Sequence, residues 1–114
     1  MKDRKKMIED TDEDIEKLFK KDVTIDLIKD SLKDIGLLRM NAIRSLIYNN
    51  LVDEEIIAKL KDIAINGTKF KFFCYTESDF ATVALHILGY KEIPLTEWGE
   101  KILKAKDDVF TKWD

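Results

Sequence analysis

The residues most suited to chemistry lie in or near one stretch, GTKFKFFCYTESDF, at 67–80. This stretch contains the only cysteine, Cys74, and the only histidine, His86, follows it. A cysteine nucleophile needs a neighbouring base, and histidine is the usual one. His86 is expected in the middle of a helix and beside its apolar row, so we interpret it as a solvated or half-buried helix residue. Cys74 is then a small core residue, and a hydrolase built on it is only a third alternative.

Acidic residues form a second candidate cluster, EDTDED, at 9–14. Such a run attracts cations, but it lacks the ligand spacing and the glycine of a calcium loop. A helix start matched to the helix dipole explains it better. One histidine and one cysteine do not make the usual kind of zinc site, and no glycine-rich phosphate loop is present. We therefore expect no catalytic residue, no metal and no cofactor, and a protein that is not an enzyme.

The composition favours a single helical domain, 1–114. Of 114 residues, 45% are apolar and 38% are charged, with only 4 glycines and 1 proline. This is enough apolar material for a core and too few turn residues for an all-β fold. The net charge of -3 argues against sequence-independent binding of nucleic acid, which requires a surplus of lysine and arginine.

The same counts bear on the compartment. A single cysteine cannot form an internal disulfide, which favours a reducing compartment. The charged start is not followed by the apolar region of a secretory signal. No run approaches the ~18 apolar residues that span a membrane. We expect a cytoplasmic protein with no membrane partner.

Periodicity and capping residues predict six helices. Their ranges are 11–21, 24–36, 37–50, 53–67, 76–89 and 95–106, with 1–6 frayed. The predicted N-caps are Thr11, Thr24, Asp53, Thr76 and Thr96. Gly36 follows the second helix where a left-handed residue is wanted, Asn49 and Asn50 close the third, Gly67 follows the fourth and Gly89 stops the fifth. The sixth helix is expected to bury Trp98, Ile102 and Ala105, and Val109, Phe110 and Trp113 are spaced for one more turn, which either docks on that helix or stays free.

The aromatic residues at 70–75 allow two structures. Lys69, Phe70, Lys71 and Phe72 alternate as in a strand, but a lone strand needs a partner and no second strand is evident. We interpret the stretch as a connector whose phenylalanines fill the groove between helices. An exposed binding patch is the alternative.

Two internal sequence repeats suggest how the helices pair. The motif LKDI occurs at 32–35 and at 60–63, and a period of 42 aligns Ala42 and Leu46 with Ala84 and Leu88. The segment RMNAIRSLIYNNLVDEEIIAKLKDIAIN, residues 39–66, resembles a HEAT unit of the armadillo/HEAT class. The resemblance implies an all-α fold in which three antiparallel hairpins, at 7–36, 37–67 and 76–106, stack as a short right-handed solenoid.

A HEAT-like array implies a protein that binds another macromolecule by surface shape. The leading hypothesis is a non-enzymatic protein–protein interaction module. One version is a bacterial immunity-type inhibitor whose acidic surface attracts a basic toxin domain. The predicted contact residues are Glu9, Asp10, Asp12, Glu13, Asp14, Arg39, Arg44, Phe72 and Tyr75.

Two other kinds of partner stay open. A HEAT-like nucleic-acid-binding protein is the alternative, with Lys59, Lys61, Lys69, Lys71 and Lys91 gathered on one side. The net charge of -3 makes nucleic acid the less favoured partner. The apolar end of the array, formed by the last helix and the tail, also offers a surface for a homodimer.

Overall fold

The computed structural model describes residues 15–34, 36–67, 71–72 and 75–110, with side chains at 71, 72 and 75 excepted. The elements in chain order are α2 (Ile25–Leu32), α3 (Leu37–Tyr48), α4 (Glu54–Asn66), β1 (Lys71–Phe72), β2 (Tyr75–Thr76), α5 (Glu77–Ile87), α6 (Glu97–Lys104) and α7 (Lys106–Val109). Helices form every layer of the described chain, so the predicted all-α class is confirmed. Of these helices, none is long and apolar enough to cross a bilayer.

Side-chain caps begin four of the helices, as predicted. Thr24 accepts from the amide of Leu27, and Asp53 accepts from the amide of Ile56. Thr76 and Asp79 form a reciprocal capping box at the start of α5, and the Thr96 hydroxyl accepts from the amide of Gly99. Each cap satisfies backbone donors that the first turn of a helix leaves unpaired. The predicted cap Thr11 lies outside the described residues.

Residues with positive φ stand after α3 and α5 and before α3. Gly36, Asn50 and Gly89 have φ of 109°, 53° and 97°. A side chain beyond Cα makes this conformation costly, so glycine and asparagine are the residues that adopt it readily. The predicted stops after α3 and α5 are confirmed, whereas α2 ends at Leu32, before Gly36, which is instead the N-cap of α3.

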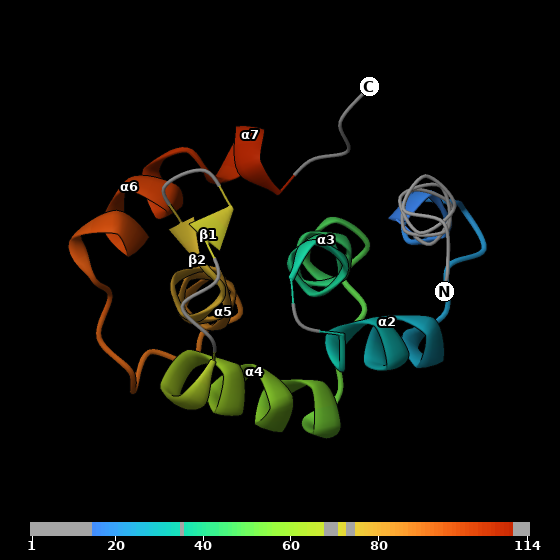
Figure 1. The fold of residues 1–114 in the computed structure, drawn as a ribbon, viewed down its shortest axis with the longest axis horizontal. Helices are drawn as coiled ribbons and strands as arrows, with labels where there is room; N and C mark the ends of the chain where they lie inside the picture. The colour runs from blue at the N-terminus through green and yellow to red at the C-terminus, as the bar shows by residue number, and fades with distance from the viewer. Residues whose placement is uncertain (1–14, 35, 68–70, 73–74, 111–114) are drawn as a thin grey trace, which may run out of the picture.

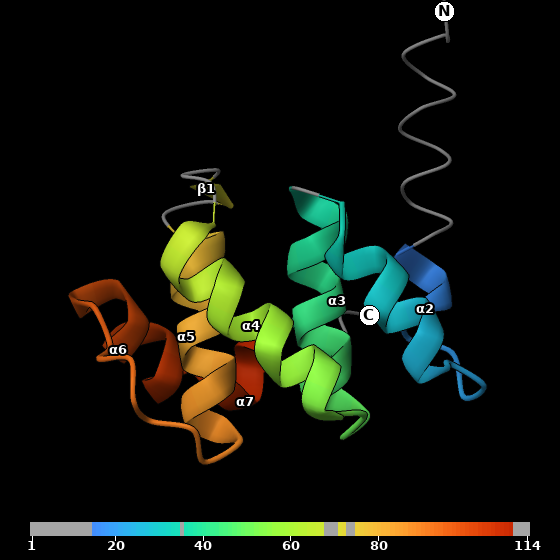
Figure 2. The same cartoon turned by 90° about the horizontal axis from the view of Figure 1, so that it is seen from below.

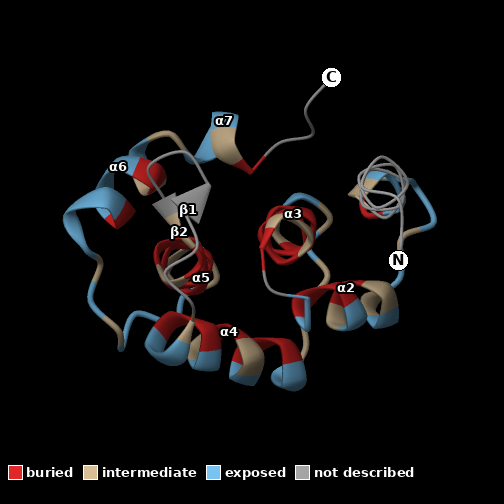
Figure 3. Cartoon of the chain, viewed as in Figure 1, coloured by how far each residue is buried: buried red, intermediate tan, exposed pale blue. Residues whose placement is uncertain are grey.

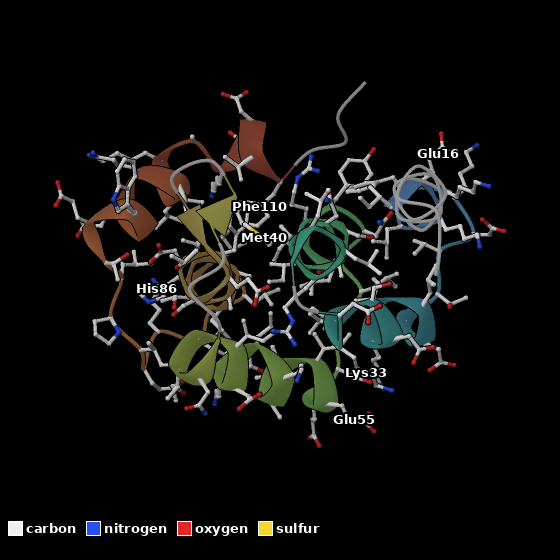
Figure 4. The ribbon with its side chains drawn as sticks, viewed as in Figure 1. Glu16, Lys33, Met40, Glu55, His86 and Phe110 are labelled. Carbon is white, nitrogen blue, oxygen red and sulfur yellow. The ribbon has the colours of Figure 1, made fainter. Side chains whose placement is uncertain are left out.

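The buried residues occupy the inner faces of α2 and α4 and nearly every face of α3 and α5 (Figure 3). They include Leu18, Ile28, Leu32, Met40, Ile43, Leu46, Ile56, Leu60, Ile63, Phe80, Val83, Leu85, Ile102 and Phe110. Met40 of α3 and Phe110 both point into the space between α3 and α5 (Figure 4). Trp98 was expected to be buried but is 42% exposed, because the buried face of α6 carries Gly99 and Ile102.

The helices form two layers. In Figure 1, α3 and α5 are seen end-on and side by side, while α2 and α4 lie across one side of them. α2 packs mainly on α3, and α4 packs mainly on α5. The hydroxyl of Ser78, at the start of α5, donates to the carbonyl of Ala64, near the end of α4. α4 and α5 therefore run antiparallel, whereas the expected hairpin of α3 with α4 is not a principal contact.

The relation of α5 to α6 also differs from the expected antiparallel hairpin at 76–106. The Thr96 hydroxyl donates to Asp79 Oδ1 at 2.5 Å, so the two helices begin next to each other. α5, with 11 residues, is about 16 Å long, and a connector such as 88–96 spans up to roughly 30 Å. The connector is long enough to return the chain alongside α5 to the start of α6 (Figure 2).

Two short strands interrupt the helical pattern. β1 and β2 are antiparallel, with Lys71 opposite Thr76 and Phe72 opposite Tyr75. The expectation that this stretch has no partner strand is wrong, because the chain reverses within the stretch and pairs with itself. The side chains of its phenylalanines and of Cys74 are not described. The predicted filling of a groove by the phenylalanines therefore stays a prediction.

The chain after α6 docks on the core. Phe110 is 3% exposed, and its ring lies edge-on to Phe80 with centroids 5.9 Å apart. The extra turn was predicted around Val109, Phe110 and Trp113, whereas α7 is Lys106–Val109 and reaches only the first of these residues. The tail was expected either to dock on the sixth helix or to stay free, and Phe110 instead docks against Phe80 of α5. Trp113 lies outside the described residues.

Candidate functional site

A cavity of about 450 Å³ opens between the segment 15–21 and helix α3. We call it the Phe19 cavity. Its described lining residues are Ile15, Glu16, Phe19, Lys20, Lys21, Asn41 and Arg44. Its volume falls in the range of about 300–1,000 Å³ that is usual for binding pockets.

Aromatic and cationic groups build one wall of the cavity. The guanidinium carbon of Arg44 lies 5.2 Å from the centroid of the Phe19 ring. Phe19 also approaches Tyr48, with ring centroids 6.1 Å apart. Phe19 thus contacts both a cation and a second ring, and each contact favours one ring orientation.

Arg44 joins three parts of the chain. Its Nε donates to the carbonyl of Val109 at 2.7 Å, and its Nη1 donates to Asn41 Oδ1 at 2.7 Å. Asn41 in turn donates to the carbonyl of Leu37. Burial lowers the pKa of Arg44 to about 10, which leaves the guanidinium charged at neutral pH. The wall of the cavity is therefore a buried cation in a fixed position.

Hydrogen bonds from α3 hold the segment 15–21 in place. Ser45 Oγ donates to the carbonyl of Leu18 at 2.5 Å, and Asn49 Nδ2 reaches the same oxygen at 3.4 Å. The Leu18 side chain is completely buried. The cavity therefore has two walls that are both tied to the core.

Charged side chains surround the mouth. Glu16, Lys20 and Lys21 are exposed, and Glu16 points away from the body of the molecule (Figure 4). Among the described residues, neither Lys20 nor Lys21 takes part in an ion pair. By contrast, Lys29, Lys33, Lys59 and Lys61 each lie within an ion pair.

Arg39, a predicted contact residue, is 6% exposed. Its Nη1 lies 2.9 Å from Glu77 Oε2, and its Nε donates to the carbonyl of Leu32 at 2.7 Å. Glu77 Oε1 accepts from the amide of Gly36 at 2.6 Å. These bonds join α2, α3 and α5, so Arg39 offers little surface to a partner.

The other predicted contact residues divide by position. Arg44 lines the Phe19 cavity but is 1% exposed. Glu9, Asp10, Asp12, Glu13 and Asp14 lie outside the described residues. Phe72 and Tyr75 lie on paired strands, and their side chains are not described. Of the predicted set, only Arg44 is placed at this cavity.

The residues considered for catalysis have structural surroundings. His86 is half-buried, and its Nε2 lies 2.6 Å from the carbonyl oxygen of Ile93 in the connector 88–96. Figure 4 shows His86 directed from α5 toward that connector. The half-buried position predicted for His86 is confirmed. No three His, Cys, Asp or Glu side chains within the described ranges converge as a metal site would require.

The lysines of the nucleic-acid alternative are partly neutralised. Lys59 pairs with Asp62, and Lys61 pairs with Glu92. Lys91 is exposed, while the side chains at 69 and 71 are not described. The two described pairs reduce the local positive potential that phosphate binding requires.

No family model, curated protein or solved structure matches the chain. The site is therefore defined by its geometry. Sequence reasoning missed Phe19, Lys20 and Lys21. The adjacent letters FKK gave no signal for a cavity, because lysine is depleted rather than enriched at protein interfaces.

Proposed function

We propose that this chain is a non-enzymatic protein-binding module. The observation that carries the proposal is the Phe19 cavity, which combines an aromatic wall, a buried cation and a charged mouth. Interfaces between proteins have an apolar centre, with aromatic residues and arginine enriched, and a polar rim. The cavity has this arrangement on a scale suited to one or two side chains of a partner.

The rigidity of the scaffold supports this proposal. Arg39 and Glu77 tie α3 to α5, and Asp79 and Thr96 tie α5 to α6. Binding to a preorganised surface costs less conformational entropy than binding to a mobile one. The internal polar groups therefore act to hold a binding surface in shape.

A HEAT-like array is the finer version of the scaffold in this proposal. The period of 42 relates α3 to α5, and these helices pack side by side. Their starts meet at Arg39 and Glu77, and their ends, at Ile47 and Ile87, line a common groove. Parallel equivalent helices are what stacked repeats produce. The units proposed here are α2–α3 and α4–α5, which pack on each other, in place of the hairpins expected at 37–67 and 76–106.

The immunity-type version adds a basic partner domain. It depends on the net charge of -3, which speeds encounter with a positively charged protein. A nucleic-acid partner is less favoured, because Lys59 and Lys61 are already paired with carboxylates. A salt series distinguishes the two, since phosphate contacts give a steep loss of affinity with salt.

The test is affinity capture from the organism that encodes the chain, with purified full-length protein as bait. The baits are the wild type, Phe19→Ala in the cavity, and Ile65→Ala, whose side chain is 69% exposed on α4. We expect a protein that is enriched by the wild type and by Ile65→Ala and is lost with Phe19→Ala. Its direct binding is then measured by calorimetry with the purified pair. Failure to enrich any protein over empty resin would refute the proposal.

A further inference from the structure

We infer that the Phe19 cavity takes an apolar side chain that is flanked by carboxylates in a segment of the partner protein. This inference rests on the proposed function and specifies the partner's chemistry.

The wall selects an apolar side chain. Ile15 and Phe19 provide carbon surface, and the volume of about 450 Å³ is larger than one aromatic side chain requires. An aromatic or long aliphatic group entering there meets the carbon surface of Ile15 and Phe19. Contact with the Phe19 ring favours a second aromatic ring, so phenylalanine, tyrosine and tryptophan are the best anchors.

The mouth selects carboxylates beside that anchor. Two exposed cations, Lys20 and Lys21, and one exposed carboxylate, Glu16, are among the described lining residues. Lys20 and Lys21 have no ion-pair partner among the described residues, in contrast to Lys29 of α2, Lys33 just after it, and Lys59 and Lys61 of α4. An acidic segment of a partner would supply countercharges to Lys20 and Lys21. This is a local departure from the chain's net charge of -3, and a partner that is basic elsewhere still satisfies it.

The cavity is formed before any partner arrives. The carbonyl of Leu18 is held by Ser45 and Asn49, and Arg44 is held by Asn41 and Val109. A partner segment therefore loses its own freedom on binding, while the cavity loses little. Short peptides should bind measurably without the rest of the partner.

The test is selection of a displayed library of random peptides against three versions of the full chain. The versions are the wild type, Lys20→Glu/Lys21→Glu, and a matched control, Lys104→Glu/Lys106→Glu, whose lysines are exposed on α6 and α7. Circular dichroism and thermal unfolding establish that all three are folded. We expect the wild type and the control to enrich peptides with an aromatic residue flanked by aspartate or glutamate.

The charge-reversed variant should bind those peptides at least about tenfold more weakly, because like charges then face each other. It should instead enrich peptides in which lysine or arginine flanks the aromatic residue. Enrichment of basic peptides by the wild type, equal binding by the wild type and Lys20→Glu/Lys21→Glu, or no enrichment at all overturns the inference. A captured protein that depends on Phe19 but whose binding is unaffected by Lys20→Glu/Lys21→Glu leaves the proposed function standing and removes this inference alone.

Discussion

Arg39 of α3 and Glu77 of α5 form an ion pair at 2.9 Å in which both side chains are buried. The pair lies where three helix ends meet, because Glu77 also accepts from the amide of Gly36, and Arg39 also donates to the carbonyl of Leu32. Gly36 has φ of 109°, which glycine adopts without strain. Each charged group thus has partners that offset part of the free-energy cost of its desolvation.

The first prediction concerns this pair. Glu77→Ala and Arg39→Ala should each lower the free energy of unfolding by about 3–5 kcal/mol, because each leaves an uncompensated buried charge. The double variant should lose clearly less than the sum of the two, since neither charge then remains. Urea unfolding of all four proteins measures the coupling. Additive losses would show that the two side chains act independently.

The second prediction concerns the start of α6. Thr96→Val removes the cap to Gly99 and the donor to Asp79, and should lower the free energy of unfolding by about 1–2 kcal/mol. Thr96→Ser retains the hydroxyl and should stay close to the wild type. Hydrogen exchange in 97–104 should accelerate in the valine variant only. Equal exchange in the two variants would contradict a role for the hydroxyl.

The third prediction concerns pH. Asp53 caps α4 and lies 2.6 Å from Lys29 Nζ of α2. The hydrogen bond with Lys29 is the main cause that lowers the pKa of Asp53 below its ordinary value of 3.8. The hydrogen bond with Asp53 likewise is the main cause that raises the pKa of Lys29 above 10.5.

The direction of this pH dependence follows from the linkage between proton binding and folding. A lowered carboxyl pKa stabilises the fold above pH 3.8, and this contribution is lost as the pH falls through the folded-state pKa. The raised lysine pKa stabilises below pH 10.5, and this is lost as the pH rises beyond it. Asp53→Asn keeps a good cap but removes the charge, so its melting temperature should fall less than that of the wild type between pH 5 and pH 2. Parallel curves would contradict the assignment.

The fourth prediction concerns Arg44, which is buried and bonded to Asn41 and Val109. Arg44→Ala should lower the free energy of unfolding by about 3 kcal/mol, because two acceptors lose their donor and a large volume is emptied. Arg44→Lys retains a positive charge but not the planar guanidinium, and should recover only part of the lost free energy of unfolding. Denaturant titration checks both. A neutral effect of Arg44→Ala would show that the guanidinium does not support the cavity wall.

The fifth prediction contrasts two aromatic residues near the C-terminal end. Phe110→Ala should cost about 3–4 kcal/mol, because the ring is buried against Phe80. Trp98→Ala should cost under about 1 kcal/mol, because its ring is 42% exposed. Thermal unfolding of the two variants gives the comparison. The same Trp98 variant, run by gel filtration at several concentrations, tests the predicted homodimer surface.

Local signals predicted much of the helical structure. The caps Thr24, Asp53, Thr76 and Thr96 and the stops Asn50 and Gly89 act within one or two turns, so their sequence neighbours suffice to identify them. Packing was harder to predict. An apolar face shows that a helix is buried but not which neighbour it meets, so α6 was expected antiparallel to α5 and Trp98 was expected inside.

The candidate site was only partly accessible from sequence. Arg44 was among the predicted contact residues, but its bond to Val109 joins positions far apart in the chain. The cavity exists because Leu18 of the first segment binds α3 through Ser45 and Asn49. No periodicity encodes that contact, since it depends on how two elements approach each other in space.

The amino-acid sequence by itself determined that this chain is helical and where most of its described helices begin and end. These features depend on hydrogen bonds between near neighbours and on the handedness of single residues. Tertiary structure alone decided that α5 and α6 start together, that Arg39 is matched by Glu77, and that Phe19 and Arg44 enclose a cavity. Those relationships join residues distant in the chain, and their free energy depends on burial and on geometry that only the folded packing creates.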